Sequence, residues 1–473
     1  MATLSSTVLP IEIWGSILTR LTQLSDLCSL SVVCRNWRPL AFPHLYHTVY
    51  LSRSSHLEQF AEGVGATSSA LSFADHIREL VLDGGPDPGN YRATIFNANL
   101  GSLVKVLTLT TGLRRFAWNL NFVPKNPRLF EVLRDNCPNL RTFEFEAPAD
   151  IGMFSGGGYT RMFDLQNLEN MAITIQHHGP LRFNPNLESF ALPLRSSPNL
   201  KSLALLIEAD YDSQTCWSPS TLLNSLKDLT FPSLHSFNAG GVVDNLWYQA
   251  FAAPGSDPLG AFFTRHPGLR TISLGWMEQV SYEAIIAPEI VESLFPSLVH
   301  FCAPAALSGP VMASKLANQL ETLSIIELVP PHGPSLETAA QAARPMPNLR
   351  KLVIDGRRQG WVKMDAVKQI LGYTPDLEEF DISQGLDQPE LLPSLRLIPN
   401  LRVLTVETFG WSGVKTDSQW DAYVVELAKA CHKLNRVNNS RSWCSWDIER
   451  RGDDEVVLHR SKFDVSALSP LPL

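Results

Sequence analysis

The sequence has no long hydrophobic run, no closely spaced cysteine pair and no excess of basic residues. A helix that crosses a bilayer needs about 18–20 consecutive apolar residues, and because no such run is present, a membrane protein is not expected. Residues 1–7 carry no charged side chain and no long apolar region, so a secretory signal is not expected either. These absences favour a chain that works in the cytoplasm or the nucleus.

Cysteine usage and net charge exclude two further classes of protein. The seven cysteines, at positions 28, 34, 137, 216, 302, 431 and 444, are scattered and form no C-x-x-C pair, which is typical of reduced thiols. The net charge is −8, whereas nucleic-acid binders usually carry a basic patch, so nucleic acid is not an expected partner. The 473 residues are too many for one compact core unless they form a repeat array.

Residues 8–50 read as three short amphipathic helices. Ile13, Ile17 and Leu21 are four residues apart, and Trp14 and Leu18 widen the same apolar stripe. We expect Ser25 to cap a second helix that carries Leu27 and Leu30, and a third helix to carry Val33, Trp37 and Leu40. So small a module exposes more apolar surface than it can bury, and it therefore needs a partner.

This segment closely resembles the F-box in the order and spacing of its residues. The matching positions are Leu9, Pro10, the Ile/Leu stripe, Leu27, Leu30, the run Val33-Cys34-Arg35-Asn36-Trp37-Arg38, and Leu45-Tyr46. One departure is Pro39, which we expect to end or kink the third helix before Leu40. The resemblance implies docking on the Skp-type adaptor of a cullin–RING ubiquitin ligase. The implied adaptor-binding residues are Leu9, Pro10, Ile13, Trp14, Ile17, Leu18, Leu21, Leu27, Leu30, Val33, Cys34 and Trp37. The alternative is a plain helical cap that packs on the next domain.

After a helical linker at residues 51–75, a repeat of the form x-Pro-Asn-Leu-Arg-x-Leu-x-Leu begins. Its thirteen copies start at residues 77, 113, 140, 168, 200, 234, 269, 298, 320, 349, 377, 401 and 434, at intervals of 22–36 residues. Alternation in L-x-L predicts a short strand, and the residues before many copies have helical spacing. In eight copies a proline stands two places before the first leucine, where we expect it to end the helix. A similar stretch at 187–192 is too close to the copy at 200 to be a unit, so we place it on the helical side.

Helix, stop and strand in each unit predict an α/β leucine-rich-repeat solenoid, with a parallel sheet on the concave side and helices on the convex side. The pattern resembles the irregular leucine-rich repeats behind F-boxes in fungal proteins, and it covers residues 76–440. One departure is that the asparagine that normally follows L-x-L is nearly absent, with only Asn121 at that place. Residues 441–473 contain Trp443, Trp446 and a Val-Val-Leu run, and we interpret them as a β-like cap followed by a loose tail.

No constellation of residues indicates catalysis. The glycines at 156–158 lack the lysine of a phosphate-binding loop, and His177-His178 lack partner ligands at metal spacing. Residues 410–413 are not a nucleophile elbow, and Cys431 beside His432 is expected to be a core residue. We therefore predict a protein that is not an enzyme, with no catalytic residues, no cofactor and no metal site.

The outward column inside the L-x-L cores holds small or neutral side chains and two acids, and the next outward column adds four acids. Neither column contains lysine or arginine, so this face favours neutral or basic segments and repels phosphate. The candidate substrate-binding residues are Glu144, Glu146, Asn238, Ser273, Trp276, Asp355, Asp381 and Glu407. The alternative is that small residues merely suit a tightly curved strand face.

Together these features predict a substrate-recognition subunit of an SCF-type ubiquitin ligase, with the F-box on the adaptor and the repeats on a protein substrate. Two alternatives stay open: an adaptor-binding scaffold without a role in degradation, and a leucine-rich-repeat regulator of an enzyme. The sequence does not identify the substrate.

Overall fold

The structure is a computed structural model of the 473-residue chain. It describes residues 11–18, 20–21, 23–33, 37–66, 73–83, 100–120, 122–124, 128–148, 164–177, 188–209, 217–243, 249–252, 254–277, 286–326, 335–356, 362–383, 391–407, 417–440, 444–451 and 455–462. The chain divides into two compact units. The first unit contains residues 1–200 and 210–213, and the second contains residues 201–209 and 214–473.

The first unit begins with helices and continues as alternating strands and helices. Its elements are α1 (Ile11–Leu18), α2 (Leu24–Val33), α3 (Arg38–Leu45), β1 (Thr48–Leu51), α4 (Ser54–Ala66), the 3₁₀ helix η1 (Phe73–His76), β2 (Glu79–Asp83), α6 (Leu100–Leu109), β3 (Arg115–Asn119), α7 (Arg128–Asn136), β4 (Thr142–Pro148), β5 (Asn170–His177) and α9 (Glu188–Arg195). Strands β1 to β5 pair in sequence order, and every pair is parallel.

The second unit repeats the same alternation and ends in a hairpin. Its elements are β6 (Ser202–Ala209), α10 (Pro219–Asn224), β7 (Ser236–Val243), α11 (Gln249–Ala252), α12 (Pro258–Arg265), β8 (Thr271–Met277), α13 (Pro288–Leu294), β9 (His300–Pro304), α14 (Ala305–Ala313), the 3₁₀ helix η4 (Lys315–Gln319), β10 (Thr322–Ile326), α15 (Leu336–Ala342), β11 (Lys351–Asp355), α16 (Met364–Gly372), β12 (Glu379–Ile382), α17 (Leu391–Leu395), β13 (Val403–Val406), α18 (Asp417–Ala430), β14 (Arg436–Asn439), β15 (Cys444–Arg451) and β16 (Glu455–Lys462). Strands β6 to β14 are parallel neighbours in sequence order.

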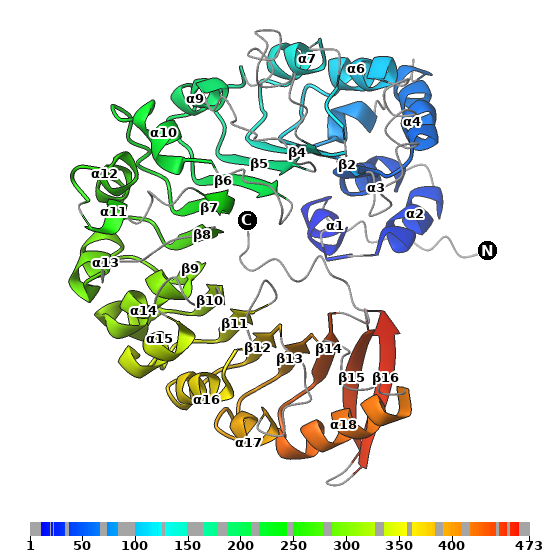
Figure 1. The fold of residues 1–473 in the computed structure, drawn as a ribbon. Coiled ribbons are helices and arrows are strands. Elements are labelled where there is room, and N and C mark those ends of the chain that lie inside the picture. Colours follow the sequence, from blue (N-terminus) through cyan, green and yellow to red (C-terminus); the bar gives the residue numbers. More distant parts are fainter. Residues whose placement is uncertain are drawn as a thin grey trace. The chain divides into compact units, whose positions relative to one another are not determined.

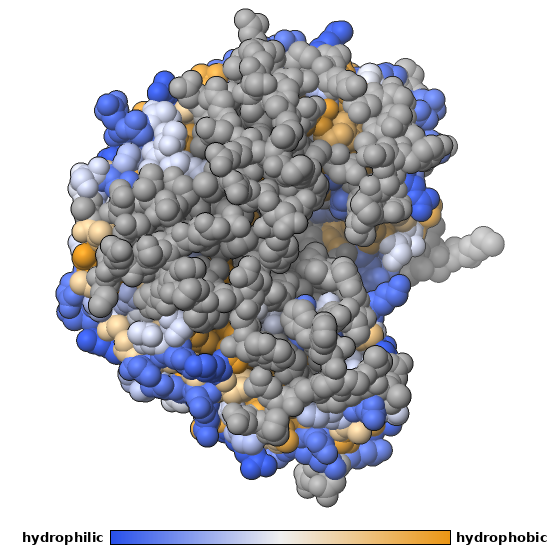
Figure 2. Space-filling view, viewed as in Figure 1, coloured by the Kyte–Doolittle hydropathy of each residue, from blue (hydrophilic) through white to orange (hydrophobic). Residues whose placement is uncertain are grey.

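Strands β2 to β14 each begin two residues after the first residue of their repeat, which is leucine in every copy but the first, where it is Ile77. In β11, Leu352 and Ile354 are fully buried, and the preceding Leu349 is buried with them. In α16, Ala366, Val367, Ile370 and Leu371 face the same core, while hydrophilic residues gather over the outside of α15 and α16 (Figure 2). Within the second unit the helices lie on the outer side of the curve and the strands on the inner side (Figure 1). The predicted fold class is confirmed.

A ladder of shared hydrogen bonds fixes the register between neighbouring repeats. The carbonyl oxygen of Arg114 accepts hydrogen bonds from the N–H groups of Arg141 and Thr142, at 2.8 and 2.9 Å. The same arrangement recurs from Lys201 to His235 and Ser236, and in the later repeats of the second unit. Side chains at equivalent repeat positions therefore lie side by side on adjacent strands.

The repeat prolines occupy tight turns between helix and strand. In the turn before β12, Pro375 follows Thr374, and the N–H of Leu377 donates to the carbonyl of Thr374 at 3.2 Å. The same hydrogen bond, from an N–H group to the carbonyl three residues earlier, joins Leu140 to Cys137 and Leu401 to Ile398. Proline at the second position suits such a β-turn because its φ is already fixed near the required value. The proline thus both follows the helix and forms the turn that starts the strand.

Three local expectations at the N-terminal helices are corrected. Strand β1 precedes the thirteen predicted strands; its pattern has Tyr46 in place of the first leucine. Pro39 does not end the third helix, because it lies in the first turn of α3, where no intrahelical N–H bond is lost. Ser25 does not cap the second helix, since α2 already begins at Leu24. The segment 187–192 falls largely on α9, on the helical side, as predicted.

Strands β15 and β16 pair antiparallel with each other and add to β14 as a hairpin, so the β structure expected near the C-terminus is present. Trp446 of β15 is 1% exposed; its ring stacks on Trp420 at 5.9 Å, and its Nε1 donates to Asp421. Within the described ranges, no helix is both long enough and apolar enough to cross a bilayer.

Candidate functional site

Helices α1 to α3 form a small packed module. Leu18 and Leu27 are 1% and 4% exposed, and Ala41 of α3 is fully buried. The rings of Trp14 and Trp37 meet edge to face, with 4.5 Å between centroids. The module thus has its own core, which holds α1 and α2 against α3.

The same module leaves several large apolar side chains in solvent. Ile13 and Ile17, one turn apart on α1, are 47% and 41% exposed, and on α2 the exposed fractions of Leu24, Val32 and Val33 are 62%, 82% and 66%. Among the described residues, nine large hydrophobic side chains are exposed in all, so five of nine belong to α1 and α2. This concentration indicates a surface that a partner covers.

The residues predicted to bind the adaptor divide by exposure. Ile13, Ile17 and Val33 are exposed, Trp14, Leu21, Leu30 and Trp37 are half-buried, and Leu18 and Leu27 are buried. Leu9, Pro10 and Cys34 lie outside the described residues. Leu24 and Val32 were not among the predicted residues. Both lie on α2, but Leu24 precedes Ser25, the residue that was expected to cap the second helix.

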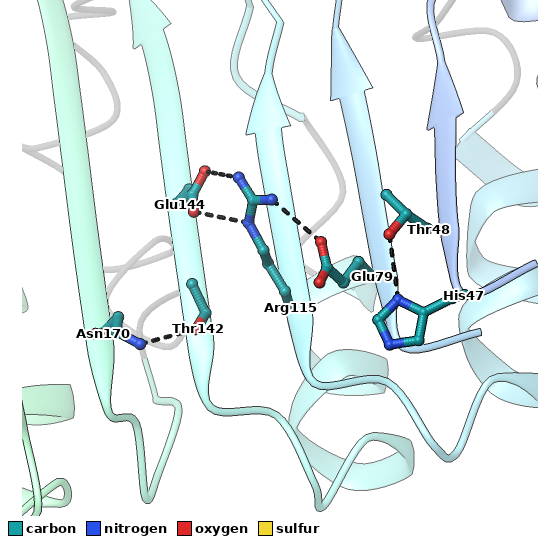
Figure 3. A network of polar contacts seen from close by, with 7 residues as sticks. All are labelled: His47, Thr48, Glu79, Arg115, Thr142, Glu144 and Asn170. Carbon is teal, nitrogen blue, oxygen red and sulfur yellow. Dashed lines mark hydrogen bonds and ion pairs between the residues drawn. The ribbon is translucent and has the colours of Figure 1, made fainter. Parts of the chain in front are cut away.

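A polar network runs across the N-terminal ends of β1 to β5 (Figure 3). Arg115 of β3 lies at its centre: Nε and Nη2 donate to the two oxygens of Glu144 at 2.8 and 2.9 Å, and Nη1 donates to Glu79 at 3.2 Å. These hydrogen bonds, led by those to Glu144, raise the pKa of Arg115. To its side, Asn170 donates to Thr142 at 3.1 Å. Parallel register brings these side chains together from strands that are 27 to 36 residues apart in the sequence.

A recess of about 470 Å³ adjoins this network in the first unit. Arg78, Arg114, Arg115 and Arg141 line it together with two glutamates, Glu79 and Glu169. These arginines were not among the predicted site residues, because the prediction used the columns inside and after L-x-L and not the residue directly after the first leucine, where Arg114 and Arg141 stand.

The candidate substrate-binding side chains on the strands are mostly half-buried and engaged with neighbours. Glu146 accepts from Gln176 at 2.6 Å, and Asp355 accepts from Ser383 at 3.0 Å. Ser273 is 7% exposed. Glu144, Asn238, Asp381 and Glu407 are half-buried, and the side chain of Trp276 lies outside the described ones. The structure therefore places these residues in columns along the strands.

The remaining motifs supply no catalytic group within the described part of the chain. Cys431 is 2% exposed, and burial raises the pKa of its thiol to about 11, so it is the core residue that the sequence predicts. Across the described ranges, no group of three histidine, cysteine or carboxylate side chains could hold a metal ion. The glycines at 156–158, His178 and residues 410–413 lie outside these ranges, as does the side chain of His177.

Comparison with known proteins identifies the N-terminal module. Residues 7–52 match the F-box-like family model. Among solved structures, the TLR13–ssRNA13 complex has a TM-score of 0.32 at 11% identity, with 80% of this chain and 47% of that chain covered. A leucine-rich-repeat protein of Leptospira interrogans has a TM-score of 0.25 at 14% identity, with 83% and 100% covered. The chain spans about half the length of the first of these two. None of the curated proteins compared with the chain matches it.

The F-box-like segment includes the first strand of the repeat sheet. Residues 7–52 contain β1, which pairs in parallel with β2 from Thr48 to Leu51. The carbonyl of His47 accepts from the N–H groups of Arg78 and Glu79, both at 2.9 Å, as the carbonyls of Arg78, Arg114 and Arg141 do in the next steps of the ladder. Tyr46 stacks on Phe73 at 4.9 Å. The F-box-like helices and the first repeats are therefore joined through a shared sheet.

Proposed function

We propose that the chain is the substrate-recognition subunit of an SCF-type cullin–RING ubiquitin ligase. In this proposal the F-box-like segment docks on the Skp-type adaptor, and the repeats hold a protein substrate. The observation that carries it is the exposed apolar set Ile13, Ile17, Leu24, Val32 and Val33, on a module whose core is already packed without them. Burial of each such side chain against a partner contributes about 1.5–3 kcal/mol before the costs of association.

The connection between the two parts supports a positioning role. Helix α3 ends at Leu45 and β1 begins at Thr48, so only two residues separate the F-box-like helices from the sheet. A short, hydrogen-bonded connection holds the first repeats at a fixed orientation to the adaptor. Fixed placement of a substrate lysine near the ubiquitin-carrying enzyme raises the rate of transfer without any catalytic group in this chain.

The strand columns of the repeats are the proposed substrate surface. Glu144, Glu146, Asp355, Asp381 and Glu407 give these columns an acidic character, which favours neutral or basic segments of a protein substrate. The chemistry of ubiquitin transfer belongs to the other subunits, and the proposal places the chain in the cytoplasm or the nucleus, where these ligases act.

The F-box-like surface can be tested with a double substitution, Ile17→Asp with Val33→Asp. Both side chains are exposed, so the module keeps its core, whereas two carboxylates in the interface cannot be solvated. We expect the affinity for the Skp-type adaptor, measured by calorimetry, to fall by at least about 100-fold. Leu109→Asp on α6 is the matched control, because Leu109 and Ile17 are both 41% exposed.

Unchanged adaptor affinity of the double variant, with Leu109→Asp also unchanged, would remove the proposal. Reconstitution with the ligase subunits distinguishes this proposal from the scaffold alternative. A substrate-recognition subunit should lead to ubiquitin on the captured partner, whereas a scaffold would capture the partner without its modification.

A further inference from the structure

The recess at the N-terminal ends of β2 to β5 carries an excess of positive charge in an otherwise acidic protein. Its four arginines, Arg78, Arg114, Arg115 and Arg141, face Glu79 and Glu169. The net charge of the whole chain is −8, so this clustering of guanidinium groups runs against the composition. Like charges in one recess repel one another unless an anion compensates them.

Carboxylates compensate only part of this charge. Arg115 is bound by Glu79 and Glu144, and Arg141 Nε lies 3.7 Å from Glu169. Among the described residues, Arg78 donates only to the carbonyl oxygens of Asp75 and Ile77, at 2.7 and 3.1 Å. Arg114 is exposed, and within the described ranges no carboxylate pairs with either Arg78 or Arg114. Two guanidinium groups of the recess are therefore available to an external anion.

Gly112, in the turn before β3, makes room for the Arg78 guanidinium. A Cβ atom at residue 112 would lie 2.1 Å from Arg78 Nη1, whereas the nearest backbone atom, Asp75 O, would be 3.5 Å away. A side chain at this position would thus displace the guanidinium but not the backbone. The close approach holds the Arg78 group beside the turn, where its remaining donors are available to the recess.

Two arginines at the same repeat position in the second unit are paired with carboxylates. Arg350 lies 4.0 Å from Asp376 and 3.7 Å from Glu378, and Arg402 lies 3.4 Å from Glu378. Both arginines stand directly after the first leucine of their repeats, as Arg114 and Arg141 do, and Arg78 has the same position after Ile77. Arg402 therefore provides an equivalent arginine outside the recess.

We propose that this recess binds an oxyanion side chain, a phosphorylated serine or threonine or a pair of carboxylates, on a segment of the substrate protein. Guanidinium groups bind carboxylates and phosphates through short, charge-assisted hydrogen bonds and are the usual receptor for such groups. The inference rests on the proposed function and adds the chemistry of the recognised segment. The acidic columns begin next to the recess at Glu144, so the anionic residue binds at the strand ends while neutral or basic residues follow the strands.

The test uses the full chain bound to its adaptor and three fluorescent Gly/Ser peptides with a phosphoserine, an Asp-Asp pair or a serine at the centre. We expect fluorescence anisotropy to show that the chain binds the phosphoserine or the Asp-Asp peptide at least about tenfold more tightly than the serine peptide. Inorganic phosphate should compete with the anionic peptide, and added salt should weaken its binding. The tighter of the two anionic peptides identifies the source of the oxyanion.

Variants locate the site. Arg114→Ala and Gly112→Ala should each lower the affinity for the anionic peptide by about tenfold, and Arg402→Ala should leave that affinity unchanged. Equal binding of the three peptides, or equal effects of Arg114→Ala and Arg402→Ala, would overturn the inference. Arg114→Ala should keep full adaptor affinity, and the Ile17/Val33 variant should keep peptide binding. Failure of the recess is thereby separated from failure of the adaptor proposal.

Discussion

At the residue scale, the positions that start each turn connect one repeat to the next. His266 precedes Pro267, and its Nε2 accepts from the N–H of Phe231, the equivalent residue of the preceding repeat, at 2.9 Å. Its Nδ1 donates to the carbonyl of Phe262 at 2.7 Å. The ring is 3% exposed and bonded at both nitrogens as the neutral form. One side chain thus satisfies two backbone groups that helix and strand leave unpaired.

This arrangement predicts a pH-dependent stability. Burial, with the charge of Arg265 adding to it, lowers the pKa of His266 below 6.5, so in acid the unfolded chain binds a proton that the folded chain does not. The contribution of neutral His266 to the stability of the folded chain is fully present above pH 6.5 and is lost as the pH falls below that value. We expect the urea midpoint to fall between about pH 6.5 and 5.

His266→Gln is the control, because a glutamine amide can donate to Phe262 and accept from Phe231 without titrating. The pH dependence of its midpoint should be shallower than that of the natural chain. Equal slopes would contradict the assignment of this effect to His266.

At the element scale, the repeat strands could be predicted from sequence because the information is local. The first leucine, the turn proline and the two alternating apolar residues lie within eight residues of one another, and each of the thirteen predicted strands is present. Strand β1 was missed because Tyr46 takes the place of the leucine and no proline stands two places before it. Its strand conformation is stabilised by pairing with β2, which lies 31 residues later in the chain (Thr48 opposite Glu79).

The strand cores predict an asymmetric response to substitution on β11. Leu352 is fully buried, so Leu352→Ala removes buried methyl groups and leaves a cavity, which should cost about 2–5 kcal/mol of unfolding free energy. The adjacent Lys351 lies 3.5 Å from Glu379 at the surface, and Lys351→Ala should cost less than about 1 kcal/mol. Urea denaturation followed by circular dichroism measures both; comparable losses would mean that the core position is wrongly assigned.

At the scale of the whole molecule, the end of the parallel array has to be closed. Without β15 and β16, the edge of β14 would present unpaired backbone groups, and Trp420 would lose its contact with Trp446. Arg450 of β15 also donates to the carbonyl oxygens of Ala428 and Cys431, at 3.2 and 3.1 Å. The hairpin thus covers both the last strand and the end of α18.

A truncation after residue 440 should therefore form oligomers, because exposed strand edges pair with other chains. Size-exclusion chromatography with light scattering measures this directly. Truncation after Lys462 keeps both strands and should elute as the full chain does. A monomeric, fully folded 1–440 chain would show that the hairpin is not needed as a cap.

The sequence by itself determined the F-box-like pattern, the strand and helix alternation and the fold class, because these depend on residues within one helix or one repeat. Only the tertiary structure decided which apolar side chains of α1 and α2 remain exposed, and that Arg78, Arg114 and Arg141 line one recess. Exposure depends on what packs against a helix, and the recess depends on strand register, which brings together side chains that are 27 or more residues apart. Register is set by the hydrogen-bond ladder between repeats, and no single repeat contains that information.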